Sequence, residues 1–159
     1  MLYEVSTTPK PGLVDRNNSG SHRDMDFFTF LDSAAALAPW FGTMFRTGLD
    51  GAGAAEAELF ARLREAGIAA ERDMLTASCG ANTHKGLIYS LGILCASLGA
   101  EYAACRVLPL PLSLVLEFGS RLGRCSLADF RLPQSQETAG LSFYRDHRIT
   151  GVRGEAAAG

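Results

Sequence analysis

The chain has 159 residues, which corresponds to about one domain with a core of its own. Hydrophobic residues make up 47% and charged residues 20%, and the formal net charge is -2, so neither a disordered chain nor a polybasic nucleic-acid binder fits. Alanine and leucine far outnumber valine and isoleucine, which predicts an all-α fold. We expect a compact multi-helix bundle with long polar functional loops, forming a single helical domain over residues 1–159.

The sequence carries no export or membrane signal. The cysteines are too widely spaced for a zinc-binding pair, and we expect reduced, mostly buried thiols at Cys79, Cys95, Cys105 and Cys125. No apolar run approaches the ~20 residues that span a bilayer, and the first residues lack a signal peptide's basic and apolar regions. These features predict a cytoplasmic protein that binds neither a membrane nor nucleic acid.

The first half of the chain predicts a long polar segment followed by two helices. Residues 6–26 are polar and rich in proline, glycine and asparagine, and are longer than a plain connection needs to be. Asp24 or Asp26 can cap the next helix, which Pro39 is expected to kink. Its predicted buried stripe is Phe27, Leu31, Ala34, Ala38, Phe41 and Phe45. A second helical stretch covers residues 54–78, and Gly67 is expected to divide it in two.

The second half predicts further helices. The clearest starts near Asn82 and has the inward stripe Leu87, Leu91, Leu94 and Leu98, widened by Ile88 and Cys95. Gly86, Gly92 and Gly99 are expected to allow close helix approach. A fourth helix spans residues 112–123, with the inward positions Leu112, Val115, Leu116, Gly119 and Leu122. Ser126 is expected to cap a turn through residue 130, and a polar helix is predicted over residues 134–147. Residues 151–159 have the pattern of a loop entering a new helix.

Chemistry-bearing residues concentrate in three polar islands, at residues 8–24, 82–86 and 151–155. Each island joins glycines to cations and to at least one carboxylate or amide. This combination suits a site that holds an oxyanion beside a hydroxyl group or a metal ion.

The second island has cations where a helix normally carries acids. The first turn of a helix presents its N–H groups and a partial positive charge, which favours nearby anions. Asn82 is a good N-cap, yet His84 and Lys85 follow it and no acid occurs before Glu101. A bound phosphate at the helix start would account for this arrangement. The alternative is a solvated lysine beside a surface histidine, tolerated at small cost.

The other two islands offer metal ligands and a further cation. Asp15, Asn18, His22 and Asp24 lie within ten residues, and such an oxygen-rich set suits magnesium better than zinc. Alternatively, Asp15 is only a turn residue and Asp24 only a helix cap. Arg153 can meet a phosphate with its planar guanidinium group, while Glu155 either joins the site or only complements a helix dipole.

These islands, in this order, resemble the triphosphoribosyl-dephospho-coenzyme A synthase family. The resemblance rests on four segments: Glu4-Val-Ser-Thr-Thr-Pro-Lys-Pro-Gly-Leu-Val-Asp-Arg-Asn-Asn18, His22-Arg-Asp-Met-Asp-Phe-Phe28, Asn82-Thr-His-Lys-Gly86 and Gly151-Val-Arg-Gly-Glu-Ala-Ala-Ala-Gly159. It covers essentially the whole chain. Family members are longer at both ends, so we expect this chain to begin inside the family's first helix and to lack its C-terminal helices.

The resemblance implies a helical transferase whose substrates are ATP and 3'-dephospho-coenzyme A. In this family the 5-triphosphoribosyl group of ATP moves to a ribose 2'-hydroxyl and adenine is released. The product is the prosthetic-group precursor for the acyl carrier protein of citrate lyase or malonate decarboxylase.

The resemblance also allows roles to be assigned as a hypothesis. The expected nucleotide-binding residues are Lys10, Arg16, Asn18, Asn82, Thr83, Lys85, Gly86, Arg153 and Gly154. Asp15, Asp24 and Glu155 are expected to hold magnesium. His22 or His84 is the expected base, and Asp15 or Glu155 the carboxylate beside the ribosyl centre.

Two rival interpretations stay open. One is a helical, magnesium-dependent nucleotide hydrolase, which would use the same residues to direct water at the substrate. The other is an inactive helical module that forms a homo-oligomer through apolar stripes left uncovered.

Overall fold

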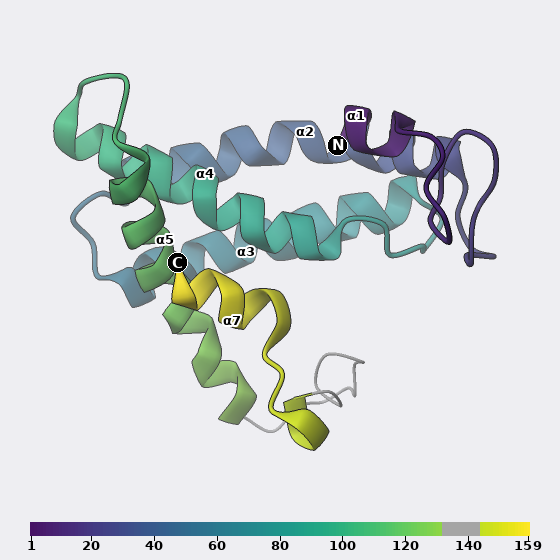
Figure 1. Ribbon diagram of the computed structural model, residues 1–159. Helices are drawn as coiled ribbons and strands as arrows, with labels where there is room; N and C mark the ends of the chain where they lie inside the picture. Colours follow the sequence, from purple (N-terminus) through teal and green to yellow (C-terminus); the bar gives the residue numbers. More distant parts are fainter. Residues whose placement is uncertain (132–143) are drawn as a thin grey trace.

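The computed structural model describes residues 1–131 and 144–159, and every regular element in those residues is helical (Figure 1). The all-α prediction is therefore confirmed. The helices are α1 (Leu2–Ser6), α2 (Phe27–Asp50), α3 (Glu56–Ala77), α4 (Lys85–Cys105), α5 (Leu112–Leu127), the 3-10 helix η1 (Ala128–Arg131) and α7 (Gly151–Ala158). Residues 144–147 are also helical, whereas the rest of the helix predicted over 134–147 lies outside the described residues.

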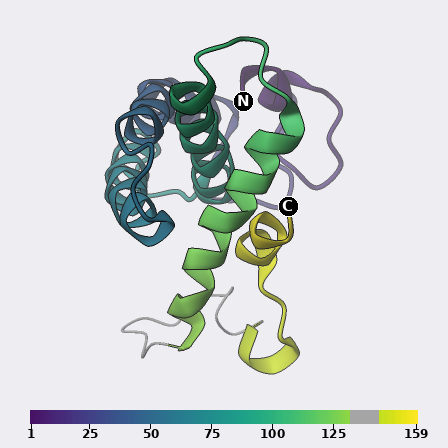
Figure 2. The same cartoon turned by 90° about the vertical axis from the view of Figure 1, so that its left-hand side faces the viewer.

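Three long helices form the body of the molecule. Figure 1 shows α2, α3 and α4 lying lengthwise beside one another, with α5 running across them and α7 lying roughly along them. α2 packs against both α3 and α4, and α4 also contacts α5 and α7. Figure 2, turned by 90°, shows α5 and α7 together on one side of the long helices. The short α1 rests on α2.

The interface between α2 and α4 depends on backbone contact at glycines. A Cβ atom added at Gly48 would collide with the carbonyl of Ala96, and one at Gly99 would collide with the carbonyl of Phe45. At Gly92 an added Cβ would lie 2.8 Å from the sulfur of Met44. The predicted close approach at Gly92 and Gly99 is thus confirmed. It is wrong for Gly86, where an added Cβ would meet nothing within 4 Å.

This close approach explains why the predicted leucine face of α4 is wrong. Leu94 and Leu98 are 37% and 38% exposed. Ile88 is buried as predicted, and the other buried residues are mostly small: Gly92, Ile93, Ala96, Ser97, Gly99 and Ala100. Only small side chains fit where two helix backbones touch, so the leucines are displaced from the interface.

The predicted stripe on α2 fails for the same reason. Of its six positions only Ala34 is fully buried, and Ala38 is exposed. The buried positions of α2 are Ser33, Ala34, Leu37, Met44 and Gly48. On α5, Val115, Gly119 and Leu122 are buried as predicted, but Leu112 and Leu116 are 68% and 39% exposed.

The helix boundaries also differ from several expectations. Asp26 caps α2 through a capping box, with its Oδ1 accepting the Thr29 N–H at 2.8 Å. The helix then continues through Pro39. α3 is likewise continuous across Gly67.

Ser126 lies buried inside α5 rather than at a cap, because α5 runs on to Leu127. The cysteines are less buried than predicted. Cys79 and Cys105 are exposed, and Cys95 and Cys125 are partly buried.

α3 is attached to α2 by apolar packing and by one polar contact. Leu59, Leu63 and Met74 of α3 are buried in the main core. At the surface of the pair, the indole Nε1 of Trp40 donates a hydrogen bond to Asp73 Oδ2 at 2.8 Å. This contact fixes the middle of α2 against the second half of α3.

α4 is long and apolar enough to cross a membrane by length and composition alone, contrary to the expectation from its sequence. This is weak evidence, since core helices of soluble proteins share both properties. α4 contacts α2, α3, α5 and α7, as a core helix does.

Gly48→Ala should destabilise the protein, because the new methyl group must displace the α4 backbone. We expect the free energy of unfolding to fall by about 1–3 kcal/mol or more, measured by urea denaturation. Gly67→Ala is the matched control, since a Cβ at this helical position meets nothing within 4 Å. It should raise stability by about 0.5–1 kcal/mol. Equal effects of the two substitutions would contradict the close helix contact.

Candidate functional site

Asp15 organises the first polar island from inside it. The side chain is 2% exposed. Its Oδ2 accepts the Lys10 N–H at 2.9 Å, and its Oδ1 accepts the N–H groups of Asn17 and Asn18 at 2.8 and 3.1 Å. These hydrogen bonds lower the pKa of Asp15 below its usual 3.8, so the carboxylate is ionised at neutral pH. The geometry favours the turn role that the sequence left open.

The other polar residues of this loop are tied to their surroundings in different ways. Lys10 Nζ pairs with Glu4 Oε1 at 2.7 Å and links the loop to α1. Asn18 Oδ1 accepts the Gly20 N–H at 2.8 Å within a turn. Arg16 lies over the ring of Phe27, 5.6 Å from its centroid. Arg16 also lines a shallow, mainly apolar depression of about 600 Å³ with Leu2, Ser6, Phe27, Phe28 and Leu31.

The three carboxylates expected to hold magnesium do not form a site. His22 and Asp24 are exposed, and their side chains approach only to 3.7 Å. Glu155 lies on the exposed side of α7, far along the chain from both aspartates. Within residues 1–131 and 144–159, no three His, Cys, Asp or Glu side chains lie close enough together to hold a metal ion. Asp15, Asp24 and Glu155 therefore do not fit a resident magnesium ion.

The second island forms the start of α4. Its first helical residue is Lys85, whose N–H is bonded to Asn82 Oδ1 at 3.3 Å. Asn82 thus supplies the predicted cap hydrogen bond, although His84 is the N-cap residue by position.

His84 is buried, contrary to the surface position of the alternative interpretation. Its Nδ1 lies 2.9 Å from Ser33 Oγ and 3.2 Å from Thr83 Oγ1. Ser33 Oγ donates its only hydrogen to the Phe30 carbonyl at 3.0 Å, and Thr83 Oγ1 donates to Ser33 Oγ at 2.9 Å. When Ser33 and Thr83 donate in these directions, Nδ1 carries the imidazole proton and Nε2 has a lone pair.

The Nε2 atom of His84 is exceptional. Among the described residues it is the one buried side-chain nitrogen or oxygen that has no hydrogen-bond partner. Burial lowers the pKa of His84 below its usual 6.5, so the ring is neutral at pH 7. A neutral, oriented imidazole with an unused lone pair is able to accept a proton.

The cation of the second island already has a protein partner. Lys85 Nζ contacts Glu71 Oε1 of α3 at 2.6 Å, and the lysine side chain is 53% exposed. A carboxylate of a neighbouring helix therefore pairs with the Lys85 ammonium group, for which the sequence predicted a bound phosphate as the partner. The helix-dipole argument alone no longer requires a ligand here.

The third island lies where α3, η1 and α7 meet. Arg153 Nη1 of α7 contacts Asp129 Oδ2 at 3.2 Å. The same carboxylate accepts two hydrogen bonds of 2.9 Å from Arg64 Nη2 of α3. Beside them, the Tyr89 hydroxyl of α4 is 2.6 Å from Ser126 Oγ of α5. Gly154 leaves room on α7 for the side chain of Thr150.

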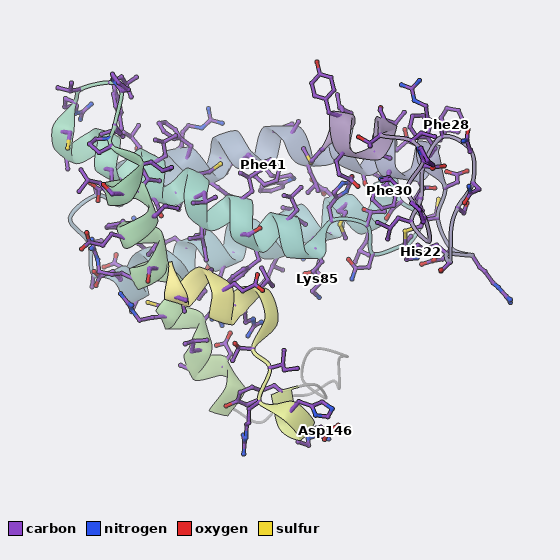
Figure 3. The ribbon with its side chains drawn as sticks, in the orientation of Figure 1. His22, Phe28, Phe30, Phe41, Lys85 and Asp146 are labelled. Carbon is purple, nitrogen blue, oxygen red and sulfur yellow. The ribbon has the colours of Figure 1, made fainter. Side chains whose placement is uncertain are left out.

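The structure joins the first two islands directly. Val14 and Met25 of the first loop pack with Ala81, which precedes Asn82, and with Phe30 of α2. The Phe30 ring also meets His84 edge-on, at 5.1 Å between centroids. In Figure 3, His22, Phe28 and Phe30 gather at the end of the molecule where α2 begins. The third island is connected to the second through α4, which carries Lys85 and Tyr89, and through α3, which carries Glu71 and Arg64.

Sequence reasoning missed the partners of the predicted residues. The sequence analysis singled out none of these partners, which are Ser33, Glu71, Arg64, Tyr89 and Asp129. Arg64 and Asp129 are 65 positions apart, so no local pattern connects them. The one usable signal was Ser33, a polar residue next to Ala34, which belongs to the predicted buried stripe of α2.

Comparison with known proteins decides the family. The family model described as ATP:dephospho-CoA triphosphoribosyl transferase matches residues 1–159. The chain belongs to this family. No solved structure matches it.

Individual relatives agree with the family match. The chain is 42% identical over 159 residues to a probable 2-(5''-triphosphoribosyl)-3'-dephosphocoenzyme-A synthase of Albidiferax ferrireducens, covering all of this chain and 52% of the relative. A protein of the same name from Vibrio cholerae is 41% identical over 162 residues, with 100% and 51% covered. Protein CitXG of Leuconostoc mesenteroides is 42% identical over 164 residues, with 100% and 35% covered. The chain thus spans about half or less of the length of these relatives.

Proposed function

We propose that this chain takes part in moving the 5-triphosphoribosyl group of ATP onto the 2'-hydroxyl of 3'-dephospho-coenzyme A. The product would be the prosthetic-group precursor for the acyl carrier protein of citrate lyase or malonate decarboxylase, made in the cytoplasm. The single observation that carries the proposal is the family match over the whole chain. The buried, unpartnered Nε2 of His84 and the cations around α4 support it.

The proposed reaction is a substitution at the anomeric carbon of ATP. The bond from that carbon to the adenine nitrogen breaks, and a bond to the 2'-oxygen of dephospho-coenzyme A forms. The proton lost by the hydroxyl equals the proton gained by the leaving adenine, so no other reactant is needed. The protein must hold three phosphates, accept the hydroxyl proton and stabilise positive charge at the ribosyl centre.

Lys85 and Arg153 are the proposed phosphate ligands, with Lys10 and Arg16 in support. Backbone groups at the start of α4, from Asn82 through Thr83 to Gly86, would contribute N–H donors. Magnesium would enter as part of the ATP complex, bound to the triphosphate. This accords with the lack of a metal-binding cluster in the described residues.

His84 is the proposed base in preference to His22. Its ring is neutral, its tautomer is fixed by Ser33 and Thr83, and its Nε2 is unused. His22 is exposed and makes only a long contact with Asp24. His84 is 7% exposed, and the Glu4 carboxylate of α1 and the amino terminus of the chain act on its ring electrostatically. For the ribosyl centre, Glu155 is preferred to Asp15, whose oxygens are occupied by backbone N–H groups.

A homo-oligomer also remains part of the proposal. Leu94 and Leu98 of α4 and Leu112 of α5 are substantially exposed, and such apolar residues favour an interface. Light scattering that gives the mass of a single chain would exclude the homo-oligomer and leave the proposed transfer reaction untouched.

The transfer is tested by following adenine released from ATP labelled in its adenine ring. We expect labelled adenine only when 3'-dephospho-coenzyme A is present, because its hydroxyl is the attacking group. An analogue that lacks the 2'-hydroxyl is the matched control and should give none. Adenine or pyrophosphate released from ATP alone would support the rival hydrolase instead.

Lys85→Ala and Glu71→Gln separate a phosphate ligand from a structural ion pair. If Lys85 binds the triphosphate, Lys85→Ala should raise the Kd for ATP about tenfold or more. Glu71→Gln should leave this Kd unchanged or lower it, since Lys85 loses a competing partner. Calorimetry with MgATP measures both constants. Similar, small effects of both substitutions would show that the pair only joins α3 to α4.

His84→Gln tests the base. We expect kcat for adenine release to fall by about 10²–10⁴-fold while helical circular dichroism is retained. His22→Gln is the control and should be near wild type. Since the neutral imidazole is the active form and burial lowers its pKa, wild-type kcat/KM should decline only below pH 6.5. An acid limb above pH 6.5, or a normal rate in His84→Gln, would exclude this assignment.

A further inference from the structure

We propose that Ser33 is a positioning residue for proton transfer through His84. Its hydroxyl oxygen keeps the ring proton of His84 on Nδ1, and it supports the ring when Nε2 takes up a second proton. Ser33 comes from α2, and His84 stands at the start of α4. The proton transfer rests on the proposed function, whereas the placement of the ring proton does not.

The two side chains meet inside the protein. Ser33 is 0% exposed and His84 is 7% exposed. The Phe30 ring meets the imidazole edge-on at 5.1 Å between centroids, and the backbone N–H of His84 donates to Met74 Sδ at 3.3 Å. In such surroundings water does not replace a missing hydrogen-bond partner, so the direction of each hydrogen decides which state of the ring is stable.

The contact contains three hydrogens: one on each of the hydroxyls of Ser33 and Thr83, and one on the neutral ring. With the ring proton on Nδ1, every hydrogen has an acceptor. Ser33 Oγ accepts from His84 Nδ1 and from Thr83 Oγ1, each at 2.9 Å. The hydrogen of Ser33 itself goes to the carbonyl of Phe30 at 3.0 Å, one turn earlier in α2.

The other tautomer lacks this balance. With the ring proton on Nε2, no side chain or backbone group in the described part of the chain accepts it. A buried N–H group without an acceptor is rare in folded proteins. Ser33 therefore favours the Nδ1–H form, in which the Nε2 lone pair of His84 is available.

The same hydrogen bond supports the ring after it has taken up a proton. Ser33 Oγ still accepts from Nδ1, and this bond becomes stronger when the donor ring is charged. The two charges that act on the ring oppose each other, since the Glu4 carboxylate favours the imidazolium and the amino terminus of the chain disfavours it. Ser33 thus acts on proton transfer through His84 and needs no contact with a substrate.

The ring tautomer is measured by NMR on protein labelled with carbon-13 and nitrogen-15 in its three histidines, since ring shifts distinguish Nδ1–H from Nε2–H. The loss of one signal in His84→Gln assigns the ring. We expect Nδ1–H in the wild type. In Ser33→Ala the ratio of Nδ1–H to Nε2–H should fall about tenfold, because the acceptor at 2.9 Å is gone.

Ser97→Ala is the matched control. Ser97 is also 0% exposed, and its hydroxyl donates to the Ile93 carbonyl at 2.8 Å within α4. The substitution removes an equally buried hydroxyl from the same helix bundle, so it should leave the tautomer ratio of His84 unchanged. An Nε2–H ring in the wild type, or equal ratios in wild type and Ser33→Ala, would overturn the proposal.

Adenine release gives a second readout that a purely structural role would not move. Ser33→Ala should lower kcat about tenfold and change KM for either substrate by less than about twofold, because Ser33 acts through His84. Ser97→Ala should retain the wild-type kcat. If Ser33→Ala does not fold, Ser33→Cys takes its place, since sulfur is a weak acceptor in a side chain of similar shape.

The outcomes separate this role from the proposed reaction. A tautomer ratio that depends on Ser33, in a protein that releases no adenine, would support the placement of the ring proton and count against the reaction. Adenine release with a wild-type kcat in Ser33→Ala, despite a changed tautomer ratio, would overturn the role of Ser33 in proton transfer.

Discussion

The contact between the backbones of α2 and α4 is the constraint on which the other features depend. At Gly48 and Gly99 these two helices approach until no side chain fits between them. This fixes α4 lengthwise against α2, so that Ser33 of α2 meets the imidazole at the start of α4. The polar network around His84 is therefore a product of helix packing. A shift of either helix along the other would separate its donors from its acceptors.

Local features were predictable where the chemistry lies within a few residues. The Asp26 cap, the polar first loop and the cap hydrogen bond from Asn82 follow from short-range rules. The inward faces of α2 and α4 did not follow, because hydrophobicity suggested mainly phenylalanines on α2 and leucines on α4. Glycines and alanines occupy the interface instead, because the two backbones lie too close together for larger side chains. A hydrophobic pattern shows that a face exists but does not show how closely its neighbour approaches.

The candidate site was predictable only in part, because electrostatic partners are set by the fold. The sequence marked Lys85 and Arg153 as candidate phosphate ligands, but their carboxylate partners, Glu71 and Asp129, come from other helices. These acids have two consequences. They stabilise the folded chain without ligand, and they occupy the same donors that a phosphate would use.

The indole of Trp40 gives the fold a built-in spectroscopic reporter. Trp40 is the only tryptophan in the chain, and its hydrogen bond to Asp73 spans the boundary between α2 and α3. Its fluorescence therefore senses the separation of these two helices and needs no added label. Since Asp73 lies only two residues from Glu71 on α3, emission from this one ring also reports on the part of α3 that carries the ion pair with Lys85.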